Sequence, residues 1–302
     1  MLGIFVGAVI AGIFIGIAFR PEEEPEVIDE LTNYEIYENA AIATDAANCS
    51  FIGNEMLKQN GSAVDAAIAA LLCVGLHNCH STGIGGGNFM VIHMKRWGVT
   101  EVIDARETAP LNSTYDMFSN HPDEDASTTG GLAIAVPGEL HGMWTAHQRW
   151  GLIPWDKLFE PTIELAANGF VVGAPLAKAI RQYNDTILAD EGLSEYFVGD
   201  DGEILKEGDI CVMKKLAATL QLIADRGAME FYSGVTAEAV VADIQERGGI
   251  ITSQDLLNYE AKKKAPLELR MGDSIMYTPS PPASGAVLSF ILNILEENWT
   301  SY

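Results

Sequence analysis

The chain has 302 residues, 48% of them hydrophobic and 20% charged, which is typical of a folded globular protein with a full hydrophobic core. Asp and Glu number 42 against 18 Lys and Arg, so the formal net charge is −24. Such a surface repels a polyanion, and we therefore expect no nucleic-acid partner.

The N-terminal run of residues 2–19 carries no charge. As a helix it would be about 27 Å long, slightly short of the roughly 30 Å hydrocarbon core. Three interpretations remain open: a signal-anchor, a cleaved signal peptide and a buried core helix. The length of the run favours an anchor, whereas Gly16-Ile17-Ala18 offers a small-x-small cleavage site. Residues 20–39 are rich in acid and proline and are interpreted as a solvated tether.

The globular part is expected over residues 40–302. A short strand is predicted at 40–45 and a helix at 48–59. Ser62 and Asp65 form a capping-box-like start for a helix at 63–76, which is apolar on nearly every side and should be buried.

A β-hairpin is predicted next, with strands at 88–95 and 99–105 joined by Arg96-Trp97-Gly98. Another short strand is predicted at 131–136. Helices are expected at 140–149, 155–168, 213–226, 236–247 and 286–297, and an extended segment at 267–278. This mixed order of strands and helices indicates an α+β or layered fold.

A glycine-rich turn at 83–87 precedes the hairpin, and Arg106 follows its second strand. The planar guanidinium of an arginine is always charged and matches a carboxylate. A surface salt bridge from Arg106 to Glu107 or Asp104 is the alternative. The glycines do not fit a nucleotide site, because a P-loop needs a Gly-Lys-Ser/Thr ending and a dinucleotide fingerprint needs a following helix, whereas a strand follows here.

Four segments, 59–69, 81–87, 104–110 and 131–139, together resemble the γ-glutamyltransferase family, also called glutathione hydrolases. The resemblance runs from about residue 40 to about residue 296 and covers the large-subunit portion only. It implies the αββα sandwich of N-terminal-nucleophile hydrolases, incomplete in this chain. It also implies transfer of the γ-glutamyl group of glutathione to water or an amino acid, without a cofactor.

The resemblance assigns one substrate-binding residue, Arg106, which would hold the α-carboxylate of the substrate. No catalytic residue is assigned, because the family's nucleophile is the N-terminal threonine of a small subunit, activated by its own α-amine. We find no segment that matches that half and expect the chain alone to be inactive. A non-catalytic membrane glycoprotein or interaction subunit is the alternative, and the Arg106 motif favours the enzyme.

The resemblance also implies a disulfide between Cys49 and Cys73, whereas Cys79 and Cys211 depart from the family pattern and are interpreted as buried thiols. No Cys-x-x-Cys occurs and the six histidines form no convincing ligand cluster, so we expect no metal.

Asn-x-Ser/Thr sequences occur five times, and those at Asn112 and Asn298 lie in loop-like contexts suited to glycosylation. Arg20, just after the apolar run, would place the following chain in the cytosol by the positive-inside rule. The glycosylation sequences and the family resemblance favour the opposite orientation. We therefore expect a single-pass membrane protein with an extracellular globular part, or a secreted protein if residues 2–19 are cleaved.

Overall fold

The computed structural model describes residues 37–119 and 121–299, with side chains described up to residue 295. The chain divides into two units, Met1–Ala41 and Ile42–Tyr302, and every described helix and strand belongs to the second. The predicted anchor or signal peptide at 2–19 and most of the acidic tether at 20–39 lie outside the described residues.

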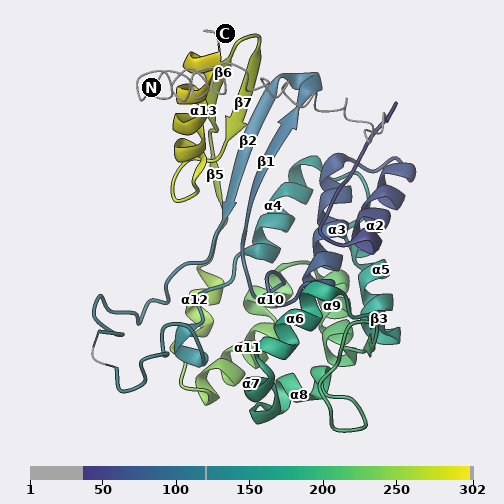
Figure 1. The fold of residues 1–302 in the computed structure, drawn as a ribbon, viewed down its shortest axis with the longest axis vertical. Coiled ribbons are helices and arrows are strands. Elements are labelled where there is room, and N and C mark those ends of the chain that lie inside the picture. Colours follow the sequence, from purple (N-terminus) through teal and green to yellow (C-terminus); the bar gives the residue numbers. More distant parts are fainter. Residues whose placement is uncertain (1–36, 120, 300–302) are drawn as a thin grey trace, which may run out of the picture. The chain divides into compact units, whose positions relative to one another are not determined.

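The first two helices in the described part of the chain are α2, Ala47–Lys58, and α3, Ala63–His77, which pack against each other as Figure 1 shows. The predicted capping box is confirmed, because the Asp65 N–H donates to Ser62 Oγ and the Ser62 N–H donates to Asp65 Oδ2. The predicted strand at 40–45 is wrong. The Thr44 N–H donates to Ser50 Oγ at 2.9 Å instead of joining a strand ladder.

Asp65 also connects α3 to a distant part of the chain. Its carboxylate is fully buried, and Oδ2 accepts hydrogen bonds from the backbone N–H groups of Leu152, at 2.9 Å, and Ile153, at 3.3 Å. These two residues link α4, Glu139–Trp150, to α5, Trp155–Asn168. One buried carboxylate thus fixes both the start of α3 and the α4–α5 connection, because a buried charge is stable only when it is hydrogen-bonded.

The predicted hairpin is confirmed as β1, Asn88–Met94, and β2, Val99–Ala105. A third antiparallel strand, β5, Lys262–Lys264, pairs with the other edge of β2. Helix α4 packs against β1 and β2 (Figure 1). Gly142 permits this close approach, since a Cβ at that position would lie 2.4 Å from the Ala105 Cβ.

Two other strand predictions need correction. At 131–136 the structure has a 3₁₀ turn, Gly131–Ala133, and only Val136 makes a β-bridge, to Thr108. Pro137 lacks an N–H and cannot extend that pairing. The extended segment at 267–278 is a hairpin of β6, Leu267–Met271, and β7, Ser274–Thr278, because the chain reverses at Gly272, whose φ is +52°.

The other predicted helices are confirmed with small changes at their ends. α5 packs against α9, Lys214–Arg226, and the C-terminal helices include α11, Val235–Glu246, and α13, Gly285–Trp299. Several shorter elements were not predicted from the sequence: β3 (Phe170–Val171), α6 (Ala174–Gln182), α7 (Asn184–Ala189), α8 (Glu191–Phe197), β4 (Ile210–Cys211), α10 (Met229–Ser233) and α12 (Ser253–Leu257). The fold of the second unit is α+β.

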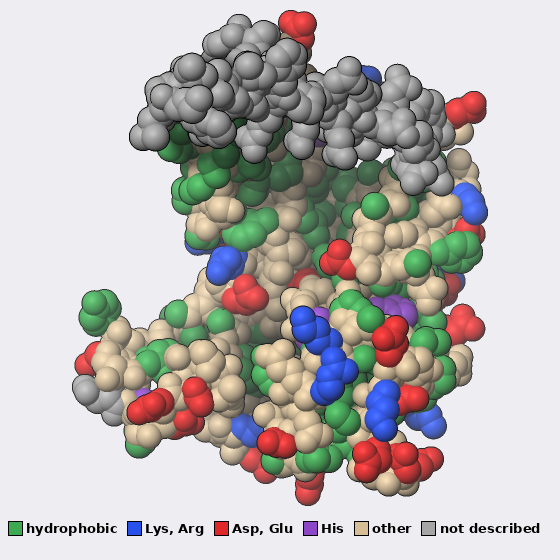
Figure 2. All heavy atoms as spheres, in the orientation of Figure 1, with side chains coloured by type: hydrophobic (Ala, Val, Ile, Leu, Met, Phe, Trp, Pro, Cys, Tyr) green, Lys and Arg blue, Asp and Glu red, His purple; other side chains and the backbone are tan. Residues whose placement is uncertain are grey.

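Two hydrophobic clusters form the core of this unit. The larger one joins α2, α3, α4, α5, α9, α10, α11 and α12 to the C-terminal end of β2. The smaller one surrounds Phe170 and Leu176. The acidic composition is visible at the surface, where Asp and Glu side chains gather around α7, α8 and the loop at 200–203 (Figure 2).

Candidate functional site

The glycine-rich turn and Arg106 lie on neighbouring ends of the β1–β2 hairpin. The antiparallel register pairs Asn88 with Ala105, so the turn at 83–87 enters β1 where Arg106 leaves β2. The hairpin, which the sequence predicts, therefore brings the two motifs together.

The backbone of Arg106 is fixed by hydrogen bonds to the nearby Asp104 and the distant Tyr259. The Tyr259 hydroxyl donates to the Arg106 carbonyl at 2.8 Å, and the Arg106 N–H donates to Asp104 Oδ1 at 3.2 Å. Asp104 is itself paired with Lys264 at 2.6 Å. The alternative expected for Arg106, a salt bridge to Glu107 or Asp104, is not formed among the described residues, where Asp104 pairs with Lys264 instead.

The Arg106 side chain is exposed. Within residues 37–119 and 121–295, its guanidinium makes no hydrogen bond or ion pair. A fixed backbone with a free guanidinium is suited to a ligand carboxylate, which can accept two parallel N–H bonds.

Close backbone packing explains the glycines of the turn. A Cβ at Gly87 would lie 2.6 Å from the Ala105 carbonyl oxygen and 2.7 Å from Glu107 Oε2. At Gly83, φ is +152°, a conformation that side chains other than glycine's rarely adopt. The Gly86 carbonyl accepts from the N–H groups of Gly138 and Glu139, at 2.8 and 3.0 Å. The turn is thus held against both β2 and the start of α4.

Glu139, in the first turn of α4, is a buried carboxyl that the sequence analysis did not single out. It is 1% exposed, and Oε2 accepts a hydrogen bond from Thr82 Oγ1 at 2.8 Å, while Oε1 has no partner among the described residues. The pKa of Glu139 is raised to about 7, mainly by burial and to a smaller extent by the charge of Glu107, while hydrogen bonds from Thr82 and the Gly83 backbone oppose the shift. An acidic residue just after Pro137-Gly138 indicates the start of a helix. It does not indicate burial, so the sequence gives no signal that Glu139 is a buried carboxyl.

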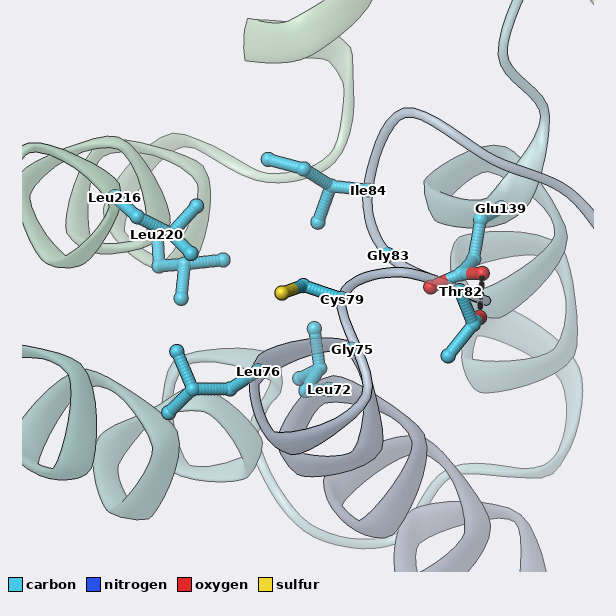
Figure 3. Close-up of a pocket in the computed structure, with 10 residues that line it drawn as sticks. All are labelled: Leu72, Gly75, Leu76, Cys79, Thr82, Gly83, Ile84, Glu139, Leu216 and Leu220. Carbon is cyan, nitrogen blue, oxygen red and sulfur yellow. Dashed lines mark hydrogen bonds between the residues drawn. The ribbon is translucent and has the colours of Figure 1, made fainter. Parts of the chain in front are cut away.

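A cavity of about 190 Å³ lies beside this carboxyl (Figure 3). Its walls come from α3, the 79–84 loop, the start of α4 and α9. The lining side chains are mainly apolar, and the Cys79 sulfur points toward the leucines of α9. The lining residues are Leu72, Gly75, Leu76, Cys79, Thr82, Gly83, Ile84, Glu139, Leu216 and Leu220.

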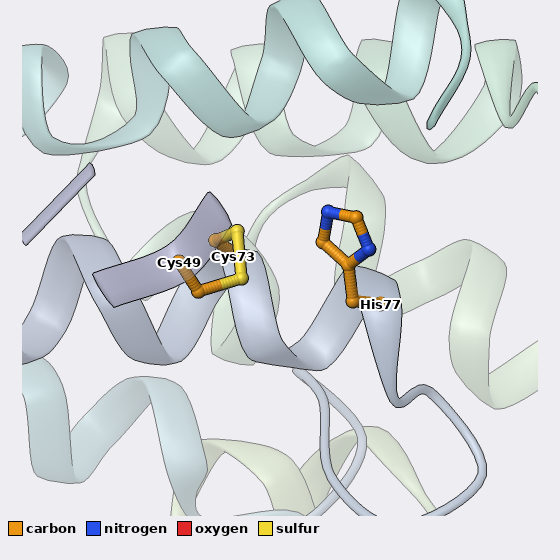
Figure 4. Close-up of side chains that lie close together, drawn as sticks. All are labelled: Cys49, Cys73 and His77. Atoms are coloured by element: carbon orange, nitrogen blue, oxygen red, sulfur yellow. A yellow bond between two sulfur atoms is a disulfide. The ribbon is translucent and has the colours of Figure 1, made fainter. Parts of the chain in front are cut away.

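The predicted disulfide between Cys49 and Cys73 is confirmed, with a sequence separation of 24 residues (Figure 4). Cys211 is buried as expected, but Cys79 is only half-buried because it lines the cavity. Burial raises the pKa of Cys79 to about 11 and that of Cys211 to about 12. Both thiols are therefore protonated at neutral pH and are poor nucleophiles.

In the part of the chain that the structure describes, one group of side chains has metal-ligand spacing, and it consists of Cys49, Cys73 and His77. Both sulfurs are held in the disulfide, so the group binds no metal in this oxidised form. His141 lies outside this group. Its ring contacts the rings of Tyr232 and Tyr259, and its Nδ1 accepts a hydrogen bond from the Ala261 N–H.

Asn112 is exposed in a turn, as expected for a glycosylation site. The backbone of Asn298 lies in α13 rather than in a loop, which corrects the expectation, and its side chain is outside the described part. Among the described helices, none has the length and apolar character needed to cross a bilayer.

The fold and the site define an α+β protein with an arginine at a strand end that can hold a carboxylate. The family model described as Gamma-glutamyltranspeptidase matches residues 49–301. The chain therefore belongs to the gamma-glutamyltranspeptidase family.

Relatives agree with this assignment. Scoloptoxin SSD14 of Scolopendra dehaani is 49% identical over 87% of the chain and 45% of its own length, and glutathione hydrolase 2 of Arabidopsis thaliana is 44% identical over 86% and 44%. The crystal structure of Helicobacter pylori gamma-glutamyltranspeptidase superposes with a TM-score of 0.83 at 32% identity, covering 88% of this chain and 77% of that one. The chain spans less than half the length of these curated relatives.

Proposed function

We propose that this chain is the large-subunit portion of an enzyme that transfers or hydrolyses the γ-glutamyl group of glutathione and other γ-glutamyl compounds. The observation that carries the proposal is the Arg106 guanidinium, free of protein partners in the described residues while its backbone is fixed by Tyr259 and Asp104. The names of the relatives, which include glutathione hydrolases, support the same substrate class.

Arg106 would bind the α-carboxylate of the γ-glutamyl group through two parallel N–H bonds, which are strong and directional. Asp104 does not compete for the guanidinium, because Lys264 holds it. The chemical step would be acyl transfer to a threonine hydroxyl, activated by its own α-amine. That threonine and the oxyanion donors would come from the small subunit, so we assign no catalytic residue here.

The small subunit would also complete an αββα sandwich. Two features support this part of the proposal. Among the described strands, β1 is paired on one edge only. α13 exposes an apolar face whose side chains are 45–67% exposed: Val287, Leu288, Phe290, Ile291, Ile294 and Leu295. A large exposed apolar face marks a surface that another polypeptide covers.

We further propose that the globular part is extracellular, attached to the membrane through residues 2–19 or secreted if these are cleaved, and glycosylated at Asn112 and Asn298. The Cys49–Cys73 disulfide supports this placement, because disulfides persist in oxidising compartments. Mass spectrometry of the natural protein, before and after removal of N-linked sugars, tests the glycosylation sites.

Arg106→Lys tests the substrate site. The substitution is made in a longer protein, in which this chain is joined to the second portion that its relatives carry. Lysine keeps the charge but loses the planar two-point contact. We expect kcat/KM for a γ-glutamyl anilide to fall about 10- to 150-fold, mostly through KM, which corresponds to roughly 1.5–3 kcal/mol. Arg181→Lys, an exposed arginine on α6, is the matched control. Unchanged kcat/KM in a folded Arg106→Lys enzyme would remove Arg106 from the site.

The 302-residue chain by itself should not turn over a γ-glutamyl anilide, because the proposed nucleophile is outside it. The measurement compares purified chain with a mock preparation. Turnover above the mock would contradict the assignment of the nucleophile to the second portion. If the joined protein is also inactive although it folds and binds its second portion, the non-catalytic alternative, an interaction subunit, is supported instead.

A further inference from the structure

Cys49, Cys73 and His77 form a buried group where α2 meets α3 (Figure 4). The two cysteines have no exposed surface and His77 is 8% exposed. One ligand atom from each residue lies within 4.8 Å of the other two. His77 Nε2 is buried without a hydrogen-bond partner among the described residues. A buried polar atom left unpaired is costly and calls for an explanation.

We propose that reduction of the Cys49–Cys73 disulfide converts this group into a zinc site formed by two thiolates and the His77 imidazole. A small thiol reductant supplies two electrons and two protons. The S–S bond breaks, the reductant becomes a disulfide, and two protein thiols form. Zn²⁺ then releases both thiol protons as the two Zn–S bonds form, and the third bond comes from the imidazole nitrogen. In the oxidised chain the sulfurs are bonded to each other and the site is closed.

The positions of the three ligands suit this ion. With Zn–S bonds of about 2.3 Å and Zn–N bonds of about 2.0–2.1 Å, ligand atoms in a tetrahedral site lie roughly 3.5–3.8 Å apart. The group already lies within 4.8 Å, so side-chain rotations after the S–S bond breaks are sufficient. Cys73 and His77 are four residues apart on one face of α3, and Cys49 faces them from α2.

Charge favours zinc over a monovalent soft ion. Two thiolates and Zn²⁺ sum to zero, so the site can stay in the hydrophobic core without a net charge, whereas Cu⁺ would leave one uncompensated negative charge. No fourth side chain in the described residues belongs to the group. The fourth coordination position of the zinc ion is therefore open to water or to the thiol of the reductant.

The test uses the full chain, reduced with a phosphine that does not compete for the metal, and Co²⁺ as the spectroscopic probe. We expect one Co²⁺ per chain, with a thiolate-to-cobalt charge-transfer band and the visible bands of a tetrahedral site, both abolished by one equivalent of Zn²⁺. The oxidised chain should show neither band. His77→Ala should weaken binding by about tenfold or more, because even loss of a residue that only supports a ligand costs 10- to 100-fold.

His80→Ala and Cys79→Ala are matched controls, because they remove a neighbouring histidine and a neighbouring thiol that lie outside the group. Both should bind Co²⁺ like the unmodified chain. The proposal is overturned if reduced chain shows no thiolate–cobalt band, if His77→Ala binds normally, or if Cys79→Ala abolishes binding. Circular dichroism follows the fold throughout. A reduced chain that unfolds and does not refold with Zn²⁺ also overturns the proposal, and this outcome does not depend on any variant.

Discussion

Glu139 is a carboxyl group in an environment that favours its neutral form. Its side chain is 1% exposed, one oxygen accepts from Thr82 and the other has no partner among the described residues. Its negatively charged neighbour Glu107 adds to the effect of burial, and the pKa of Glu139 is raised to about 7. At a Cβ position built on Gly86, an oxygen of each carboxyl is 3.8 Å away. The glycine turn therefore passes between two acids, and its stability should depend on pH.

Glu139→Gln should remove this pH dependence. An acid whose pKa is higher in the folded state than in the unfolded state stabilises the fold most below its unfolded pKa, near 4.5. That stability is lost as the pH rises to about 7, by roughly 3 kcal/mol in total. The unfolding free energies of the variant and the unmodified chain are measured in urea at pH 4.5 and pH 8. From the lower to the higher pH, the variant should become more stable relative to the unmodified chain by up to about that amount.

Glu164→Gln is the matched control, because it removes an exposed carboxyl on α5 instead of a buried one. Comparing variant with unmodified chain cancels the titration of all other groups. An identical difference in unfolding free energy at both pH values would show that folding does not raise the pKa of Glu139.

The residues of the site differ in how far the sequence reveals them. The Arg106 motif and the glycine turn were found because they are contiguous in sequence and the hairpin pattern brings them together. Tyr259 and Lys264, which fix the Arg106 and Asp104 groups, are 153 and 160 residues from their partners. No local pattern indicates such contacts, because they depend on where β5 and α12 are placed in three dimensions.

At the scale of elements, α4 is the helix that supports the hairpin end. Its Gly142 faces Ala105 and Asn88, and a Cβ added there would lie 2.4 Å from the Ala105 Cβ and 2.8 Å from Asn88 Oδ1. In an open helix, Gly→Ala is stabilising by up to about 1 kcal/mol. At Gly142 the close contact should make the same substitution destabilising.

We expect Gly142→Ala to destabilise the fold by roughly 1–3 kcal/mol through overpacking, measured by urea or thermal unfolding. Gly173→Ala, before α6, is the control, because the nearest atom to its added Cβ is Pro175 Cδ at 3.7 Å, an ordinary contact. A Gly142→Ala chain as stable as the unmodified one would mean that α4 can move away from the sheet at little cost.

The elements that the sequence predicts well have a strong local signal. α5 was predicted at its observed bounds, and α3 was recognised from its capping box and apolar composition. The strand prediction failed at 131–136, where the first three residues of this apolar segment form a 3₁₀ turn. The backbone there is fixed by tertiary contact, since a Cβ at Gly131 would lie 2.6 Å from the Arg247 carbonyl oxygen. Two-residue strands such as β3 and β4 are too short to produce a periodic pattern.

At the scale of the whole molecule, the apolar face of α13 should control association. Its exposed side chains form one continuous helical face on a chain with a net charge of −24. We expect the isolated chain to self-associate through this face, and Phe290→Asp to weaken that association about tenfold or more, because a charged group buried in an apolar contact loses its water. Light scattering over a concentration series measures the change.

Val235→Asp is the control, because Val235 is 55% exposed at the start of α11, outside this face. Equal masses for the Phe290→Asp and unmodified chains at every concentration would show that the face of α13 is not the contact. In the joined protein, Phe290→Asp should also reduce association with the second portion if that portion covers the same face.

The hydrogen bond from Tyr259 to the Arg106 carbonyl has a consequence for biosynthesis. Residue 106 leaves the ribosome 153 residues before its partner does. At about 5–20 residues per second, this interval lasts roughly 8–30 s. During that time the β1–β2 hairpin can form, but the end of β2 lacks the hydroxyl and the Lys264 ammonium that fix it. The backbone of Arg106 is therefore fixed late, after most of the helical part of the chain has been translated.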